Sequence, residues 1–309
     1  MPRSLLTSAL FAGALSACTL TSEGTSPQAT PAALPLPAAP SQQSVAIGKY
    51  YSNLQADLLV QGLLRKDGGG PDTPYTADML ARNFERIAFY DEHAVGTRLQ
   101  SADGEARQLV RWQDPVRIKV EFGPSVSRDQ READSQFVSA FADRLSKLTN
   151  HPIRPAIVRP NFHVFVFGED DRATMQTRIN EVLPGLSSAS RAIIQNLPRD
   201  MHCLILANSA DDAVPQIKSA VAIVRAEHPD LLRQTCFHEE IAQGLGLLND
   251  SRYARPSIFN DDDEFAYLTS HDEKLLQMLY DPRLKIGMTA DEARPIVKTM
   301  ARALTAQAL

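Results

Sequence analysis

The chain has 309 residues, of which 43% are hydrophobic and 22% are charged, and its formal net charge at pH 7 is −5. This composition is typical of a soluble globular protein and excludes a fibrous or wholly disordered one. The acidic balance also argues against a nucleic-acid-binding protein, which would carry basic patches. We expect one domain of about 200–220 residues with helical additions, rather than two equal domains.

An apolar segment lies near the N-terminus. Arg3 precedes a mostly apolar run from Leu5 to Leu15, which is too short to cross a bilayer because a spanning helix needs about 20 apolar residues. Such a run is typical of a signal peptide. Its end, Leu15-Ser16-Ala17-Cys18, resembles the bacterial lipobox, which implies cleavage after residue 17 and a lipid on Cys18. The alternative is an ordinary secretory signal in which the cysteine occurs by chance.

The resemblance to a lipobox also predicts a location. Thr19, and not aspartate, follows the cysteine, and by the general sorting rule of lipoproteins this favours the outer membrane. We therefore expect a lipid-anchored protein of the cell envelope that faces the periplasm and has the membrane as one partner. No second apolar run approaches membrane length, so the lipid is the only anchor that we expect.

The segment that follows the cysteine is low in complexity. Five prolines lie among Ala, Ser, Thr and Gln between residues 19 and 44, and Glu23 is the only charged residue there. Such a stretch cannot bury enough apolar surface to fold, so we interpret residues 18–45 as a disordered tether. The expected organisation is a signal peptide (1–17), this tether, an N-terminal helical segment (46–92) and a domain over 93–309 with a C-terminal helix.

Apolar periodicity predicts helices and strands along the rest of the chain. The expected helices cover residues 50–64, 76–90, 127–148 and 170–183. The expected strands cover residues 109–112, 116–122, 162–167, 201–207 and 220–224, with the first two joined as a hairpin through 113–115. This alternation predicts a mixed α/β or α+β fold, in which helices pack on a sheet.

Two threonines mark the starts of later helices. Thr269 stands three residues before Asp272, and Thr289 stands three residues before Glu292. This is the spacing of helix N-caps, and the second pair is a regular capping box. The acidic run 260–264 precedes them, and we interpret it as a solvated loop because consecutive acids seldom converge on one ion.

Cys203 and Cys236 are the two cysteines outside the lipobox. In an oxidising periplasm an even pair of cysteines is a disulfide candidate. The alternative is two buried free thiols.

The segment 230–250 holds the candidate functional residues. On a helix, Glu239, Gln243 and Gly246 are spaced i, i+4 and i+7 and therefore share one face, with Glu240 beside them. Gly246 permits a turn that brings Asn249 back toward that face. One interpretation is a hydrogen-bonded polar seam along the helix and its turn.

The same residues resemble a known catalytic motif. Metzincin zinc peptidases carry His-Glu-x-x-His-x-x-Gly-x-x-His on a helix that bends at the glycine, and this chain has Glu239-Glu240-x-x-Gln243-x-x-Gly246-x-x-Asn249. The resemblance implies a zincin-like sheet with packed helices. It also implies that Glu240 is the general base, that Gly246 is the helix bend, and that the metal positions are those of Glu239, Gln243 and Asn249. All three histidines are replaced, and the methionine turn is missing because no Met occurs from Asn249 to Gln277.

A closer resemblance is to an uncharacterised family of proteobacterial putative lipoproteins, a domain of unknown function. Three stretches carry it: Cys236-x-x-Glu-Glu-x-x-Gln-x-x-Gly-Leu-x-Asn-Asp250, Ser257-Ile-Phe-Asn-Asp261, and Leu279-Tyr-Asp-Pro-Arg-Leu284 with Gly287-Met-Thr289. The resemblance covers roughly Leu80 to Val297. It implies a peptidase-like fold and supplies no activity.

Two functions remain open from the sequence. Neutral amide oxygens are poor zinc ligands, and one carboxylate with two amides would bind a harder ion weakly. This favours a catalytically degenerate domain without a cofactor, which binds or scaffolds an envelope protein or peptide. The alternative is a hydrolase in which Glu240 acts as general base on a water bound to a divalent metal ion.

Overall fold

A computed structural model describes residues 39–90, 106–209, 215–260 and 262–306. The predicted signal peptide, the lipidation site Cys18 and residues 18–38 of the predicted tether lie outside these ranges. All elements described below belong to one compact unit, Pro37–Leu309.

The described residues form eight α-helices and five strands. The helices are α1 (Gln42–Val60), α2 (Ala77–Phe89), α3 (Arg128–Thr149), α4 (Arg172–Val182), α5 (Ser188–Gln195), α6 (Asp230–Gln243), α7 (Ser270–Leu279) and α8 (Ala290–Ala306). The strands are β1 (Val116–Phe122), β2 (Ile153–Pro155), β3 (Phe162–Phe167), β4 (Cys203–Ser209) and β5 (Ile217–Arg225). The predicted α+β class is confirmed.

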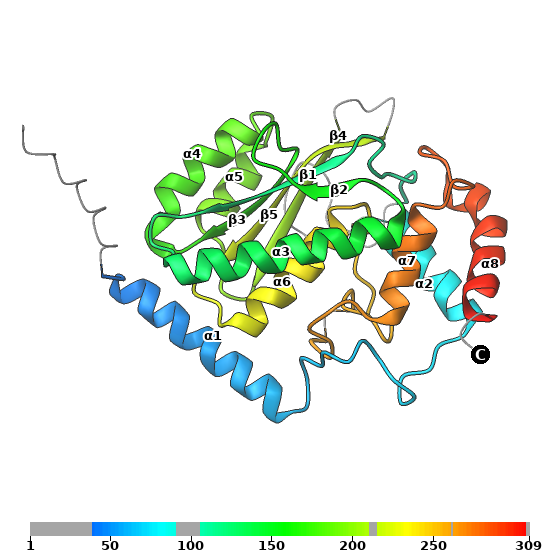
Figure 1. Cartoon of the computed structure of the whole chain (residues 1–309), viewed down its shortest axis with the longest axis horizontal. Coiled ribbons are helices and arrows are strands. Elements are labelled where there is room, and N and C mark those ends of the chain that lie inside the picture. The colour runs from blue at the N-terminus through cyan, green and yellow to red at the C-terminus, as the bar shows by residue number, and fades with distance from the viewer. Residues whose placement is uncertain (1–38, 91–105, 210–214, 261, 307–309) are drawn as a thin grey trace, which may run out of the picture. The chain divides into compact units, whose positions relative to one another are not determined.

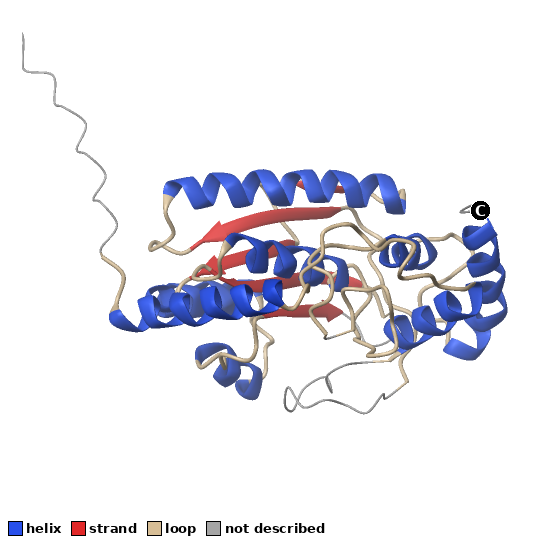
Figure 2. Ribbon diagram, turned by 90° about the horizontal axis from the view of Figure 1, so that it is seen from below, coloured by secondary structure: helices blue, strands red, loops and turns tan. Residues whose placement is uncertain are grey.

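The strands form a single mixed sheet in the order β2-β1-β3-β5-β4 (Figure 1). The first four strands are parallel, and β4 pairs with β5 in the antiparallel direction at the edge of the sheet. Figure 2 shows the strands lying between helices. Because parallel strands need crossover connections, α3 joins β1 to β2, and α4 and α5 follow β3.

Side chains of β3 show how the sheet is covered on both faces. Phe162, Val164 and Val166 join the larger core, to which α3 and α6 also contribute. Phe165 and Phe167 point to the other face and pack with residues of α4 and α5. Every residue of β3 is buried, as expected for a central strand of a parallel sheet covered on both sides.

The predicted hairpin of residues 109–112 and 116–122 is wrong. Instead, β1 lies between β2 and β3 and is parallel to both. The backbone of Leu109 bonds to the loop before α8, where its N–H donates to the Met288 carbonyl at 2.8 Å and its carbonyl accepts from Gly287 at 3.0 Å. The apolar pattern of 109–112 reflects the burial of Leu109 and Trp112 in the core, and the segment makes an isolated parallel bridge from Arg111 to Gln216 and no strand of its own.

Helix α1 begins eight residues before its predicted start at residue 50. The Ser41 hydroxyl accepts a hydrogen bond from the Ser44 N–H and caps the helix, which is the usual role of serine at this position. The last residues of the predicted tether are therefore helical. Ile47, Tyr51 and Leu58 on α1 pack in a small core with residues of α6 and of the loop before α7. Among the described residues, no helix is both long and apolar enough to span a bilayer.

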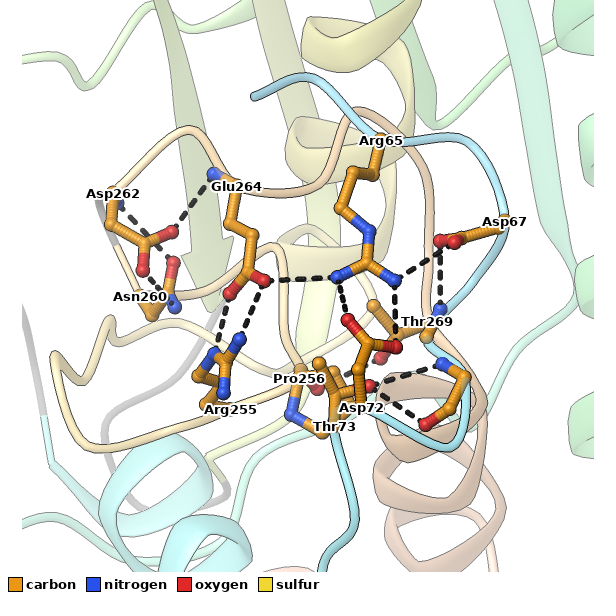
Figure 3. A network of polar contacts seen from close by, with 12 residues as sticks. Arg65, Asp67, Asp72, Thr73, Arg255, Pro256, Asn260, Asp262, Glu264 and Thr269 are labelled. Carbon is orange, nitrogen blue, oxygen red and sulfur yellow. Dashed lines mark hydrogen bonds and ion pairs between the residues drawn. The ribbon is translucent and has the colours of Figure 1, made fainter. Parts of the chain in front are cut away.

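An ion-pair network fastens the segment after α1 to the loop before α7 (Figure 3). Arg65 contacts Asp67 at 2.8 Å, Asp72 at 2.7 Å and Glu264 at 3.1 Å. Arg255 reaches the other oxygen of Glu264 at 2.6 Å. The interpretation of 260–264 as a solvated loop is therefore wrong for Glu264, whose carboxylate lies between two guanidinium groups.

Candidate functional site

Helix α6 follows β5 directly and carries the candidate residues. Cys236 on α6 is joined to Cys203, the first residue of β4, by a disulfide with a Cα–Cα distance of 5.8 Å. The predicted disulfide is thereby confirmed. Because the two cysteines are 33 residues apart, loop closure in the unfolded chain accounts for about 3–4 kcal/mol of stability. The bridge ties the edge strand to the helix.

Two carboxylates lie beside this disulfide. One carboxylate oxygen of Glu239, one of Glu240 and the sulfur of Cys203 all lie within 4.8 Å of one another. Glu240 is buried, with 4% of its surface exposed, and Glu239 is partly buried. Cys203 is not a thiolate because its sulfur is in the disulfide. Within the described part of the chain, this group therefore offers a metal ion two carboxylates, a donor set that zinc does not favour.

The other two predicted metal positions make hydrogen bonds within the fold. The Gln243 side-chain amide donates to the Asp250 carboxylate at 3.0 Å and thereby closes the turn after α6. The Asn249 amide donates to the carbonyl of Arg86 on α2 at 3.0 Å. Gln243 is buried. The structure thus brings Glu239 and Glu240 together, and it directs the amide nitrogens of Gln243 and Asn249 toward different partners.

The chain turns away from the α6 axis at a Gly-Leu-Gly sequence whose carbonyls are all capped. The Trp112 indole donates to the Gly244 carbonyl at 2.8 Å, and the Tyr280 hydroxyl donates to that of Leu245 at 2.9 Å. The Arg107 guanidinium donates to the Gly246 carbonyl at 3.1 Å. These carbonyls follow the last helical residue and are buried, and a buried carbonyl needs a donor, which the three side chains supply.

Both glycines of this turn are required by their surroundings. A Cβ on Gly244 would lie 2.5 Å from the ring of Phe162. Gly246 has a φ of +128°, and a Cβ there would lie 2.5 Å from the carbonyl oxygen of Val110. Non-glycine residues rarely adopt such a φ. The turn therefore depends on its sequence at two positions.

Gly246→Ala is expected to lower the free energy of unfolding by about 2–3 kcal/mol, because it combines backbone strain with a steric clash. Chemical denaturation of the two proteins measures the difference. Gly185→Ala is the matched control, since Gly185 has no atom within 4 Å of its would-be Cβ and no positive φ. Equal stability of Gly246→Ala and Gly185→Ala would contradict a required bend.

A buried ion pair, which the sequence pattern did not reveal, fixes α6 to α3. The Arg233 guanidinium donates to both oxygens of Asp134, at 2.8 and 2.9 Å, and also to the carbonyl of His228 at 2.6 Å. Burial raises the pKa of the Asp134 carboxyl, and the charge of Arg233 opposes that rise. The partners are 99 residues apart, so no local spacing predicts the contact.

The histidines of α6 and of the segment before it are buried and neutral. His238 stacks between Phe141 and Tyr267, with ring centroids 4.1 and 4.6 Å away. Burial lowers the pKa of His238 to about 3. His228 lies beside Cys236, and burial holds its pKa well below the usual value. These rings are therefore part of the core.

Comparison with known proteins identifies the family. Residues 77–299, more than half of the chain, match the model of a family described as protein of unknown function, DUF2927. The match contains the sheet, α6 and its turn, and both cysteines of the disulfide. No curated protein and no solved structure matches the chain. The chain therefore belongs to the DUF2927 family of proteins of unknown function.

Proposed function

We propose that the chain is a lipid-anchored protein of the cell envelope whose domain resembles a metzincin peptidase, does not hydrolyse peptides, and binds or scaffolds an envelope protein or peptide. The proposal combines the lipobox resemblance at Cys18 with the state of the residues on α6. The proposed location of the protein is the periplasmic side of the outer membrane.

The observation that carries the non-catalytic part is the chemistry of the metal positions, where Gln243 and Asn249 offer only neutral amide oxygens, which are poor zinc ligands. The amides of Gln243 and Asn249 donate to Asp250 and to the Arg86 carbonyl. Glu240, at the general-base position, is 4% exposed, whereas a general base must reach a water and a substrate. A site arranged in this way supports structure at the end of α6 more readily than hydrolysis.

Support for the envelope location comes from the Cys203–Cys236 disulfide. Disulfides persist in oxidising compartments such as the periplasm and are rare in the cytosol. Cys18 itself lies outside the described residues.

A second candidate function is that of a metal-dependent hydrolase with Glu240 as general base. The neighbouring carboxylates of Glu239 and Glu240 favour it, because they lie close together at the helix end where the metzincin motif has its first ligand and its base. In that case Glu239 would hold the metal ion and Glu240 would activate a water.

Elemental analysis separates these two functions. The protein is incubated with zinc, dialysed and analysed, and we expect well below one zinc per chain. A hydrolase of the second kind predicts one zinc per chain, lost in Glu239→Gln and retained in Glu240→Gln, because only the first residue would be a ligand. That result would overturn the non-catalytic proposal.

The anchor is tested separately by fractionation of cells of a Gram-negative host that express the full chain. We expect the protein in the membrane fraction, and we expect Cys18→Ala to move it to the soluble fraction because the lipid is lost. A membrane-bound Cys18→Ala protein would refute the lipid anchor and leave the zinc result unaffected.

A further inference from the structure

The loop between β2 and β3 exposes two neighbouring aliphatic side chains. Ile157 is 88% exposed and Val158 is 72% exposed. Single exposed aliphatic residues are common on protein surfaces and need no explanation. Two adjacent ones at the tip of a loop beside an edge strand are an apolar projection, which we call the 157–158 tip.

The loop that carries this tip is held in place at both ends. The N–H of Ala156 donates to the Ile118 carbonyl at 2.8 Å, and that of Asn161 donates to the Arg117 carbonyl at 3.1 Å. The Arg117 guanidinium donates to the Arg159 carbonyl at 2.6 Å. The tip is therefore presented by a fixed base, so its exposure does not come from a loose connection.

Positive charge surrounds the tip. Arg154 and Arg159 are exposed, and Arg154 pairs in register with Arg117 of β1, so the side chains of Arg154 and Arg117 leave the sheet on the same face. Within the described part of the chain, no ion pair joins any of these three arginines to a carboxylate. Asp114 has Lys218 as its ion-pair partner at 2.7 Å, and its pKa is lowered mainly by Lys218 and less by Arg117.

These features do not improve the stability of the fold. Like charges on neighbouring strands are unfavourable, and exposed aliphatic groups lose their hydrophobic stabilisation. A protein with a net charge of −5 nevertheless places two exposed arginines, Arg154 and Arg159, beside this tip. An anionic partner with an apolar interior would satisfy both features at once.

We propose that the 157–158 tip and its arginines form a second membrane contact, in which Ile157 and Val158 enter the interface of an anionic lipid surface and Arg154 and Arg159 contact its headgroups. Interfacial binding of this kind combines buried apolar area with attraction to anionic lipids. A protein partner is less well matched, because protein interfaces centre on aromatic anchors in pockets, and this tip is a small convex projection.

The contact is expected to be weak on its own and effective on an anchored chain. It rests on the proposed lipid anchor at Cys18 for its proximity to the membrane. The 23 residues between Cys18 and α1 could reach at most about 80 Å when fully extended. A tether of that kind raises the local concentration of the second site to about the millimolar range. The contact would then orient the domain on the membrane.

Vesicle co-sedimentation tests the proposal on a chain that lacks the covalent lipid anchor. The chain from residue 18 onward, carrying Cys18→Ala, is mixed with vesicles of phosphatidylethanolamine and phosphatidylglycerol or of phosphatidylethanolamine alone, at millimolar lipid, where a contact too weak to anchor the chain is still measurable. We expect binding to the anionic vesicles only, weakened by salt. The double variant Ile157→Asp, Val158→Asp should reduce that binding at least about tenfold.

Val60→Asp is the matched control. Val60 is also 88% exposed, but it is the last residue of α1 and is distant in the sequence from Arg117, Arg154 and Arg159. The Val60→Asp chain should bind anionic vesicles as the parent chain does. Absence of binding to anionic vesicles, or equal binding by the double variant, would overturn the proposal and leave an acidic protein surface as the partner of the arginines. Because the tested chain has no lipid attached at residue 18, failure of this test is distinct from failure of the Cys18 anchor.

Discussion

Replacing Asp272 by alanine is expected to lower the free energy of unfolding by about 4–6 kcal/mol. The Asp272 carboxylate is fully buried and accepts four hydrogen bonds. The Ser257 hydroxyl donates at 2.5 Å, the Ile258 N–H at 3.1 Å, and the N–H and hydroxyl of Thr269 both at 2.9 Å. Alanine would leave the Ser257 hydroxyl and the N–H groups of Ile258 and Thr269 without this acceptor, and each buried unsatisfied group costs about 1–3 kcal/mol. The Thr269 hydroxyl can still donate to the Pro256 carbonyl at 2.9 Å.

Glu292→Ala is a natural control, because Glu292 has the same place in a second capping box. Its carboxylate accepts from the Thr289 N–H at 2.8 Å, as that of Asp272 accepts from Thr269. Glu292 is exposed, so water can replace the lost acceptor and the expected cost is about 0.5–1 kcal/mol. Urea denaturation of both variants measures the two values. Similar costs would show that Asp272 acts only as a helix cap.

The contrast between these boxes shows what local spacing can predict. Thr269-x-x-Asp272 and Thr289-x-x-Glu292 both predict a helix start, and α7 and α8 begin directly after the two threonines. The sequence contains no sign that Asp272 also binds Ser257 and Ile258, because those partners belong to a loop that returns to α7. The cap itself depends on residues that are close in the sequence, whereas the burial of the cap depends on the tertiary structure.

The elements that were predicted well have strong local signals. The run Phe162–Phe167 of aromatic and β-branched residues forms β3 with the predicted bounds. Helix α3 begins after Ser127, whose hydroxyl caps it, and ends within one residue of the prediction. Strand β2 was missed because it is three residues long and contains an exposed arginine and a proline. Its strand conformation comes from pairing with β1.

The candidate site also has one part that the sequence predicts and one part that it does not. The sequence places Glu239, Glu240 and Gln243 on one helix, and α6 contains all three. It does not show that the turn at Gly246 is held by Trp112 and Tyr280, because these donors lie 132 and 35 residues from the carbonyls that they cap. Sequence spacing alone therefore describes the helix and leaves the supports of its end unknown.

Acid is expected to destabilise the protein through His238. The ring is 4% exposed, its Nδ1 accepts a hydrogen bond from the Leu268 N–H at 3.0 Å, and burial with the nearby charge of Arg144 lowers its pKa to about 3. In the unfolded chain a histidine binds a proton near pH 6.5. The stability that the neutral ring contributes is thus fully present above pH 6.5 and is lost as the pH falls from 6.5 toward 3.

The size of this loss follows from the two pKa values. Each pKa unit corresponds to about 1.4 kcal/mol, so protonation of the unfolded histidine costs the folded protein about 4–5 kcal/mol in total over that range. Many carboxylates also titrate there, so the slope of the parent protein alone does not isolate His238. A variant without the imidazole is required.

His238→Asn provides that comparison, because its side-chain oxygen can accept from the Leu268 N–H in place of Nδ1. We expect this variant to be less stable than the parent at pH 7.5, since it loses the stacking on Phe141 and Tyr267. The difference between the two proteins should shrink as the pH is lowered to 4, because the asparagine does not titrate. Free energies of unfolding measured in urea at pH 7.5, 6, 5 and 4 provide the test. A constant difference between parent and variant across this range would mean that His238 takes up its proton inside the fold without penalty.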